Sequence, residues 1–170
     1  WLTHVGNLER PVVADTLLLV ALAMIAGFIS MGTLAGELFR RGVPVTVTAG
    51  CGMCGFMIVQ LWMLLTPYPG HPLVWISFGF FGTSGIVAYS ALSHSFPTEL
   101  AGRVNTALNL LVFISAFVAQ WAIGAIIDWV DLRQGGHFSP AGFRTAFAIL
   151  LIIETGALVH FVRDYFYRKG

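Results

Sequence analysis

Two cysteines and one glutamate carry the most reactive side chains of this sequence. Cys51 and Cys54 form a C-x-x-C pair, a spacing that serves redox or metal chemistry when the thiol ionises. The sequence has no second cysteine or histidine pair to complete a tetrahedral metal site. Apolar neighbours also disfavour the thiolate. We therefore expect no metal, no cofactor and no redox role, and the common hydrolase patterns of an enzyme do not occur.

Glu154 lies near the middle of an apolar stretch, residues 145–165. An ionised carboxylate without water costs several kcal/mol, so the group either finds a partner or keeps its proton. Two roles follow from this. Glu154 is either a proton carrier whose protonation changes during a functional cycle, or a fixed neutral hydrogen-bond donor to a neighbouring helix.

Further polar residues interrupt two other apolar stretches. Asn109 and Gln120 are eleven residues apart, close to three helical turns, and so share one helix face. Thr83, Ser84 and Tyr89 make the preceding stretch unusually polar. Groups of this kind avoid lipid, and they either bond to adjacent helices or line a water-filled path. Both interpretations stay open for the amides and for the hydroxyls.

Glycines recur in three of the apolar stretches. Small residues let helix backbones approach closely, which drives helix association where lipid supplies no hydrophobic force. We expect close packing at the pair Gly32 and Gly36 and on a face around Gly52. A third series, at every third residue, predicts one groove along a helix: Gly79, Gly82 and Gly85.

The composition indicates the elements that hold these side chains. Of the 170 residues, 57% are hydrophobic and 10% charged, and the mean hydropathy is +0.82, whereas soluble domains have about 25% charged residues. Apolar runs this long cross the roughly 30 Å hydrocarbon layer of a lipid bilayer. No basic surface for nucleic acid is indicated. We predict an all-α polytopic membrane helix bundle with five transmembrane helices, at residues 12–38, 43–65, 73–96, 105–130 and 145–165.

The cationic residues predict the orientation of the chain, because cytoplasmic loops are enriched in lysine and arginine. One face of the predicted bundle has Arg40, Arg41, Arg103, Arg163, Arg168 and Lys169. The other has Arg10, Arg133 and Arg144. We therefore expect an outside N-terminus, a cytoplasmic C-terminus, and an integral protein of a bacterial inner membrane. Residues 32–42 and 97–103 are then cytoplasmic turns.

These two turns resemble sequence motifs of the major facilitator superfamily. The first is similar to the cytoplasmic loop G-x-L-A-D-R-x-G-R-R at Gly32, Leu34, Ala35, Arg40 and Arg41. It departs from that loop at Gly36, Glu37 and Phe39. The second resembles a later P-x-x-x-x-G-R turn through Pro97, Gly102 and Arg103.

The resemblance implies that residues 1–170 are the C-terminal transmembrane half, helices eight to twelve, of a secondary active transporter. Such a protein moves a small-molecule substrate by alternating access, coupled to an ion or a proton, with the N-terminal half of the same transporter as partner. The fragment alone would be inactive. The resemblance ranks the candidate substrate-binding residues as Thr83, Ser84 and Tyr89, then Asn109 and Gln120, with Glu154 as the candidate proton-coupling residue. The alternative is a non-transporting membrane scaffold packed through its glycine-rich faces.

Overall fold

The computed structural model describes residues 1–93, 96–133 and 140–167, and within these ranges it contains helices and no strand. Five spans are long and apolar enough to cross a membrane. This confirms the predicted all-α bundle of five membrane helices. The helices are α1 (Arg10–Arg40), α2 (Val45–Leu65), α3 (Pro72–Gly82), α4 (Gly85–Ser93), α5 (Thr98–Arg133) and α6 (Pro140–Tyr167).

Three helix boundaries differ from the sequence expectation. α1 continues through most of the predicted 32–42 turn and ends at Arg40, so that the true turn is short and contains Gly42 at φ +83°. α5 begins at Thr98, so Gly102 and Arg103 are helical, with Glu99 in the first turn, where an acidic residue is favoured by the helix dipole. The third span, Pro72–Leu92, is two helices instead of one.

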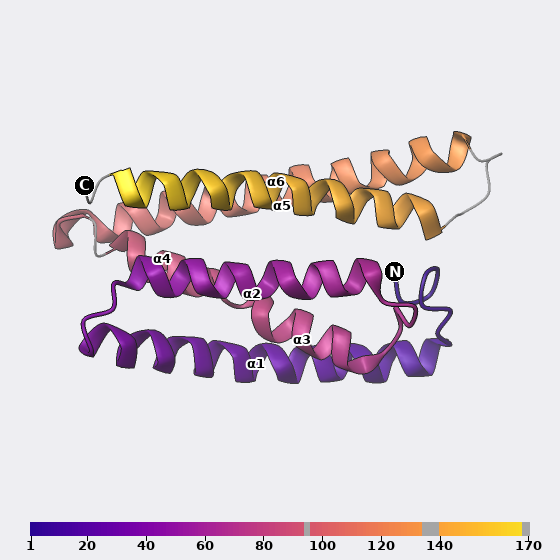
Figure 1. Cartoon of the computed structure of the whole chain (residues 1–170), viewed down its shortest axis with the longest axis horizontal. Coiled ribbons are helices and arrows are strands. Elements are labelled where there is room, and N and C mark those ends of the chain that lie inside the picture. Colours follow the sequence, from indigo (N-terminus) through magenta and orange to yellow (C-terminus); the bar gives the residue numbers. More distant parts are fainter. Residues whose placement is uncertain (94–95, 134–139, 168–170) are drawn as a thin grey trace.

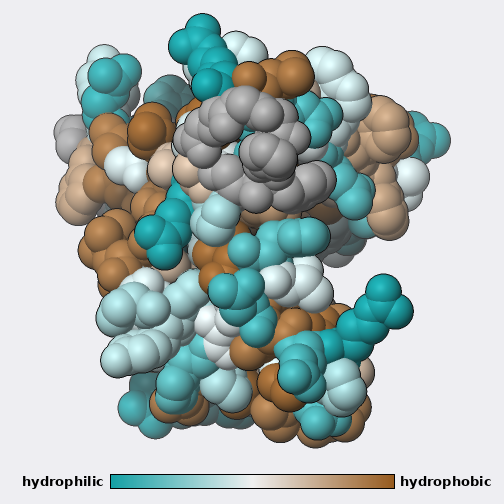
Figure 2. All heavy atoms as spheres, turned by 90° about the vertical axis from the view of Figure 1, so that its right-hand side faces the viewer, coloured by the Kyte–Doolittle hydropathy of each residue, from teal (hydrophilic) through white to brown (hydrophobic). Residues whose placement is uncertain are grey.

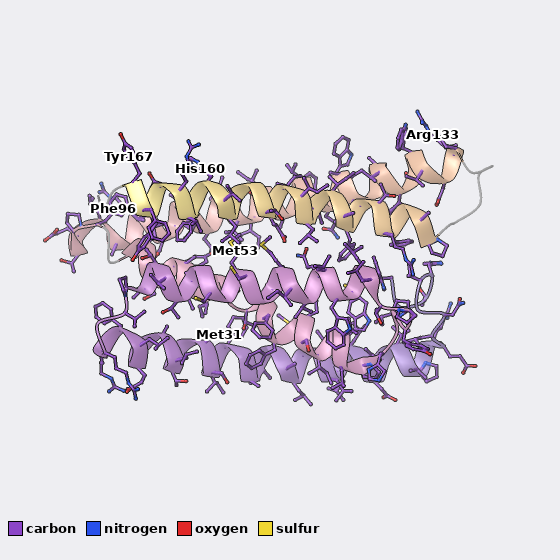
Figure 3. The ribbon with its side chains drawn as sticks, viewed as in Figure 1. Met31, Met53, Phe96, Arg133, His160 and Tyr167 are labelled. Atoms are coloured by element: carbon purple, nitrogen blue, oxygen red, sulfur yellow. The ribbon has the colours of Figure 1, made fainter. Side chains whose placement is uncertain are left out.

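The helices form two groups that lie side by side (Figure 1). α1 packs along α3, and α2 lies against α3 and α4; α5 and α6 form an antiparallel hairpin that meets α2 through α6 and α4 through α5. The ends of the hairpin are marked in Figure 3, where Arg133 lies at one end of the bundle and Tyr167 at the other. The first group therefore consists of the three spans α1, α2 and α3–α4, and the α5–α6 hairpin lies on its flank.

Glycines set the spacing within the first group. A Cβ added at Gly27 would lie 2.6 Å from the carbonyl oxygen of Phe80, and one at Gly79 would lie 2.8 Å from that of Val20. The same test at Gly52 meets the Ser84 Cβ at 2.7 Å. These contacts confirm the close-packing face predicted around Gly52. They also show that α1 and α3 touch backbone to backbone.

The N-terminal segment packs against the start of the last helix, α6. Trp1 stacks edge-on against Phe147, with ring centroids 4.7 Å apart, and also contacts Phe143. Figure 2 views this end of the bundle, where polar residues are spread among apolar ones. The segment thereby ties the start of α6 to the first helix group.

Candidate functional site

Two of the predicted cytoplasmic arginines, Arg40 and Arg41, share one acidic partner. Glu37 accepts hydrogen bonds from Arg40 and, at 2.9 Å, from Nε of Arg41. All three side chains are exposed and belong to the last turns of α1 or the residue after it. Glu37 stands at a position where the resembling motif has a basic residue. Glu37 therefore balances one of the two positive charges at the end of α1.

The glycines in the two turns that resemble family motifs have free space around them in the described chain. A Cβ at Gly32, Gly36 or Gly102 would meet no atom within 4 Å. Gly32 and Gly36 instead line a groove of about 230 Å³ between α1, the start of α2 and α4. Close packing at this pair was predicted, and no described segment supplies it.

Thr83 and Ser84 lie at the break between α3 and α4, at the middle of the third span. At the break the backbone forms hydrogen bonds between residues three apart. Ser84 N–H donates to Phe81 O at 3.0 Å, and Ile86 N–H donates to Thr83 O at 3.0 Å. Local 3₁₀ geometry of this kind marks hinges and helix breaks. The predicted groove of three glycines does not form, because Gly79 faces α1, whereas Gly82 faces Phe56 of α2.

Both hydroxyl side chains at the break are buried, with exposed fractions of 3% for Thr83 and 8% for Ser84. Thr83 Oγ1 donates to the carbonyl oxygen of Phe80 at 2.6 Å. Thr83 lies against Gly27 of α1, and Ser84 lies against Gly52 of α2. These two candidates therefore face the inside of the first helix group.

Tyr89 and Asn109 are brought together. The Tyr89 hydroxyl of α4 donates to Asn109 Oδ1 of α5 at 3.1 Å, which links the two helix groups. Gln120 is exposed and lies eleven residues further along α5, on the same helix face as Asn109. The five substrate-binding candidates thus fall at three places: the break, the α4–α5 contact and the exposed face of α5.

Glu154 has a partner that sequence reasoning missed. Gln60 of α2 donates from Nε2 to Glu154 Oε1 of α6 at 3.1 Å. Gln60 is buried, with 4% of its surface exposed. The signal was available in the sequence, because Gln60 is a lone amide in the otherwise apolar second half of α2. The sequence did not indicate that α2 packs against α6.

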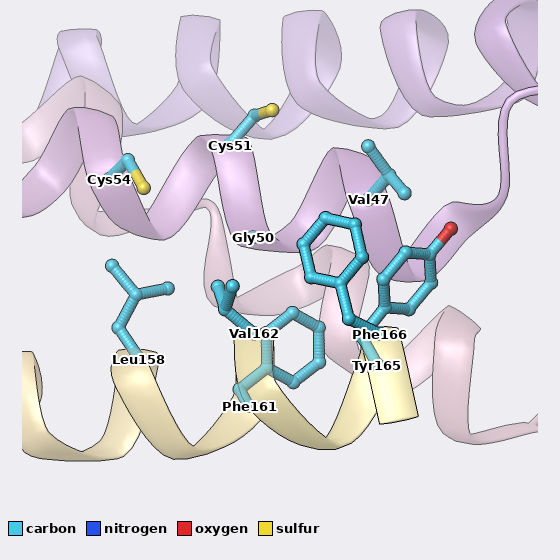
Figure 4. A pocket seen from close by; sticks show the side chains of 9 residues that line it. All are labelled: Val47, Gly50, Cys51, Cys54, Leu158, Phe161, Val162, Tyr165 and Phe166. Carbon is cyan, nitrogen blue, oxygen red and sulfur yellow. The ribbon is translucent and has the colours of Figure 1, made fainter. Parts of the chain in front are cut away.

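Cys51 and Cys54 are free and exposed on α2. They line an apolar pocket of about 220 Å³ between α2 and the end of α6, together with Leu158 and Phe161 (Figure 4). Among the described residues, no cluster of three histidine, cysteine or acidic side chains could hold a metal ion. The thiols therefore have apolar neighbours and no described ligand partner.

Two predicted features fall partly outside the described residues. Arg168 and Lys169, counted with the cytoplasmic cations, are outside them, and so are residues 134–139 of the connection between α5 and α6. Comparison with protein families, curated proteins and solved structures gives no match to this chain.

Proposed function

We propose that this chain is the C-terminal half of a secondary active transporter of the major facilitator superfamily. In this proposal it moves a small molecule across a bacterial inner membrane by alternating access, coupled to an ion or a proton, and its C-terminus is cytoplasmic. The N-terminal half of the same transporter supplies the other wall of the substrate path.

The observation that carries the proposal is the break at the centre of the third span. Secondary transporters build their substrate sites near the bilayer midplane, from helices that are interrupted there. Irregular backbone at that depth is tolerated only where it is buried in protein or lines a water-filled cavity. The break at Thr83 and Ser84 is buried against α1 and α2, which meets the first of these conditions.

The polar face of α5 supports the same function. Only 6% of the most apolar part of α5 is buried, and the Gln120 amide of this helix is exposed. An amide that faces lipid would lack hydrogen-bond partners, so the face of α5 at Gln120 requires protein or water beside it. A second transporter half would provide both, because α5 would then lie at the boundary between the halves.

Water access to α5 tests the proposal. In the natural full-length polypeptide with Cys51 and Cys54 replaced by alanine, Gln120→Cys is exposed to a membrane-impermeant maleimide. Val118→Cys is the matched control, because its side chain is 53% exposed and lies on the opposite face of the same helix. We expect at least tenfold faster labelling at position 120. Equal, slow labelling at both positions would contradict a transport path and favour the scaffold.

A further inference from the structure

The contact between Gln60 and Glu154 leaves two buried oxygen atoms unused. Gln60 Oε1 and Glu154 Oε2 are both buried without a hydrogen-bond partner, while the other two polar atoms of the same side chains bond to each other at 3.1 Å. A buried acceptor without a donor destabilises a fold by about 1–3 kcal/mol. Two such atoms in one contact require an explanation.

A single proton satisfies both atoms. A carboxylic acid and a primary amide each have one donor and one acceptor side by side, so that two such groups can pair through two parallel hydrogen bonds. Gln60 Nε2 already donates to Glu154 Oε1. A proton on Glu154 Oε2 gives that oxygen a hydrogen to donate to Gln60 Oε1, and the unused atoms then become partners.

The absence of nearby cations among the described residues also favours a protonated Glu154. α2 has no acidic, basic or histidine residue, and neither α3 nor α4 has one among its described residues. α5 has no charged residue between Arg103 and Asp128, and α1 has none between Asp15 and Glu37. On α6 itself, the nearest titratable neighbours are Arg144 and His160, which are ten and six residues away. No cation of the described chain therefore lies at the depth of Glu154 to balance an ionised carboxylate.

We propose that Gln60 and Glu154 form a proton-binding site that joins α2 to α6 inside the membrane. Glu154 holds the proton on Oε2 and donates it to Gln60 Oε1, while Gln60 Nε2 donates to Glu154 Oε1. Release of the proton breaks the first of these bonds and leaves a charge in the contact. Binding and release of one proton therefore strengthen and weaken the attachment of the α5–α6 hairpin to α2.

Infrared spectroscopy of the purified protein in lipid vesicles tests this site. We expect a carbonyl stretching band of a protonated carboxyl group at neutral pH that disappears in Glu154→Gln. This variant keeps the size of the side chain, and two amides also pair through two hydrogen bonds, so the fold is retained. If Glu154→Gln instead loses the bands of an ionised carboxylate and keeps every band of a protonated carboxyl group, the proposal is overturned.

A second variant tests the role of Gln60 without changing the acid. Gln60→Leu removes both hydrogen bonds, so the Glu154 carbonyl band should move to higher wavenumber. Thr155→Ala is the matched control, because it removes an exposed hydroxyl next to Glu154 that donates to the Leu151 carbonyl of the same helix. In this control the Glu154 carbonyl band should stay in place. A band that is unmoved in Gln60→Leu would overturn the pairing. The outcome does not depend on whether the chain transports a substrate.

Discussion

In α1 to α4, helix backbones touch at glycines, whereas the hairpin of α5 and α6 has few such contacts. Gly27, Gly52 and Gly79 each leave too little room for a Cβ. In the hairpin, a Cβ at Gly124 or at Gly156 would meet no atom within 4 Å. Among the glycines that the structure describes in α5 and α6, tight packing occurs at Gly142 near the start of α6. The buried share of the most apolar part is 17% in α1, 28% in α2 and 28% in the third span, against 6% in each helix of the hairpin.

This difference shows which helices pack tightly within the chain and which leave most of their surface exposed. Van der Waals contact between close backbones is a main source of stability among helices in lipid. The first group has that contact within the chain. Most of the apolar part of the hairpin is exposed. Besides the contact of Trp1 with Phe147, two polar contacts help to join the hairpin to the first group, Tyr89 with Asn109 and Gln60 with Glu154.

The largest effect is expected from filling the closest glycine contact. In Gly27→Leu the new Cβ would lie 2.5 Å from Thr83 Oγ1 and 2.6 Å from the Phe80 carbonyl oxygen. Backbone atoms cannot yield as a flexible side chain can, so α1 and α3 would have to separate. We expect no monodisperse protein after detergent extraction, as measured by size-exclusion chromatography. Gly32→Leu is the control, since its Cβ has open space, and an equal loss there would refute the contrast.

A pair of alanine substitutions compares the two groups directly. Gly52→Ala places a Cβ 2.7 Å from the Ser84 Cβ and should lower the free energy of unfolding by about 1–3 kcal/mol through overpacking. Gly124→Ala enters open space and should raise it by up to about 1 kcal/mol, because alanine favours the helix. Thermal unfolding of both variants in the same detergent gives the two shifts. Shifts of the same sign would remove the distinction.

The sequence predicted the parts of this architecture that depend on local chemistry. The five spans follow from runs of apolar residues, and the packing at Gly52 follows from small side chains in one of them. The break at Thr83 was not predicted, because the sequence predicts a single span over residues 73–96, and the polar second half of this span was not interpreted as a helix end. The residues of the break lie against Gly27 of a different span, where an added Cβ would lie 2.5 Å from Thr83 Oγ1 and 2.6 Å from the Phe80 carbonyl oxygen. Such a tertiary contact has no local sign in the sequence.

The candidate site was predictable only as separate residues. Glu154 was recognisable from its position in an apolar run, but Gln60 was not assigned to it, because the 94 residues that separate them give no local sign that α2 meets α6. Tyr89 and Asn109 were both chosen for polarity, and their hydrogen bond across α4 and α5 is likewise a tertiary contact.

A smaller effect is expected at the polar contact between the groups. Tyr89→Phe removes the hydroxyl that donates to Asn109, and one such hydrogen bond contributes about 1 kcal/mol. We expect the unfolding temperature to fall by roughly 2–4 °C for a chain of this size. Tyr68→Phe is a suitable control, because Tyr68 is exposed in the α2–α3 connection. A fall no greater than in that control would mean that packing alone joins α4 to α5.

The smallest effect is expected from the charges at the end of α1. Glu37→Gln removes the ionic partner of both Arg40 and Arg41, yet all three side chains are exposed and belong to one stretch of chain. Exposed ion pairs contribute about 0–1 kcal/mol, and salt screens them. We expect a fall in unfolding temperature of roughly 2 °C or less, which disappears when the measurement is repeated at high salt. A larger fall that persists in salt would mean that Glu37 holds a contact between helices, and the first group would then depend on charge as well as on its glycines.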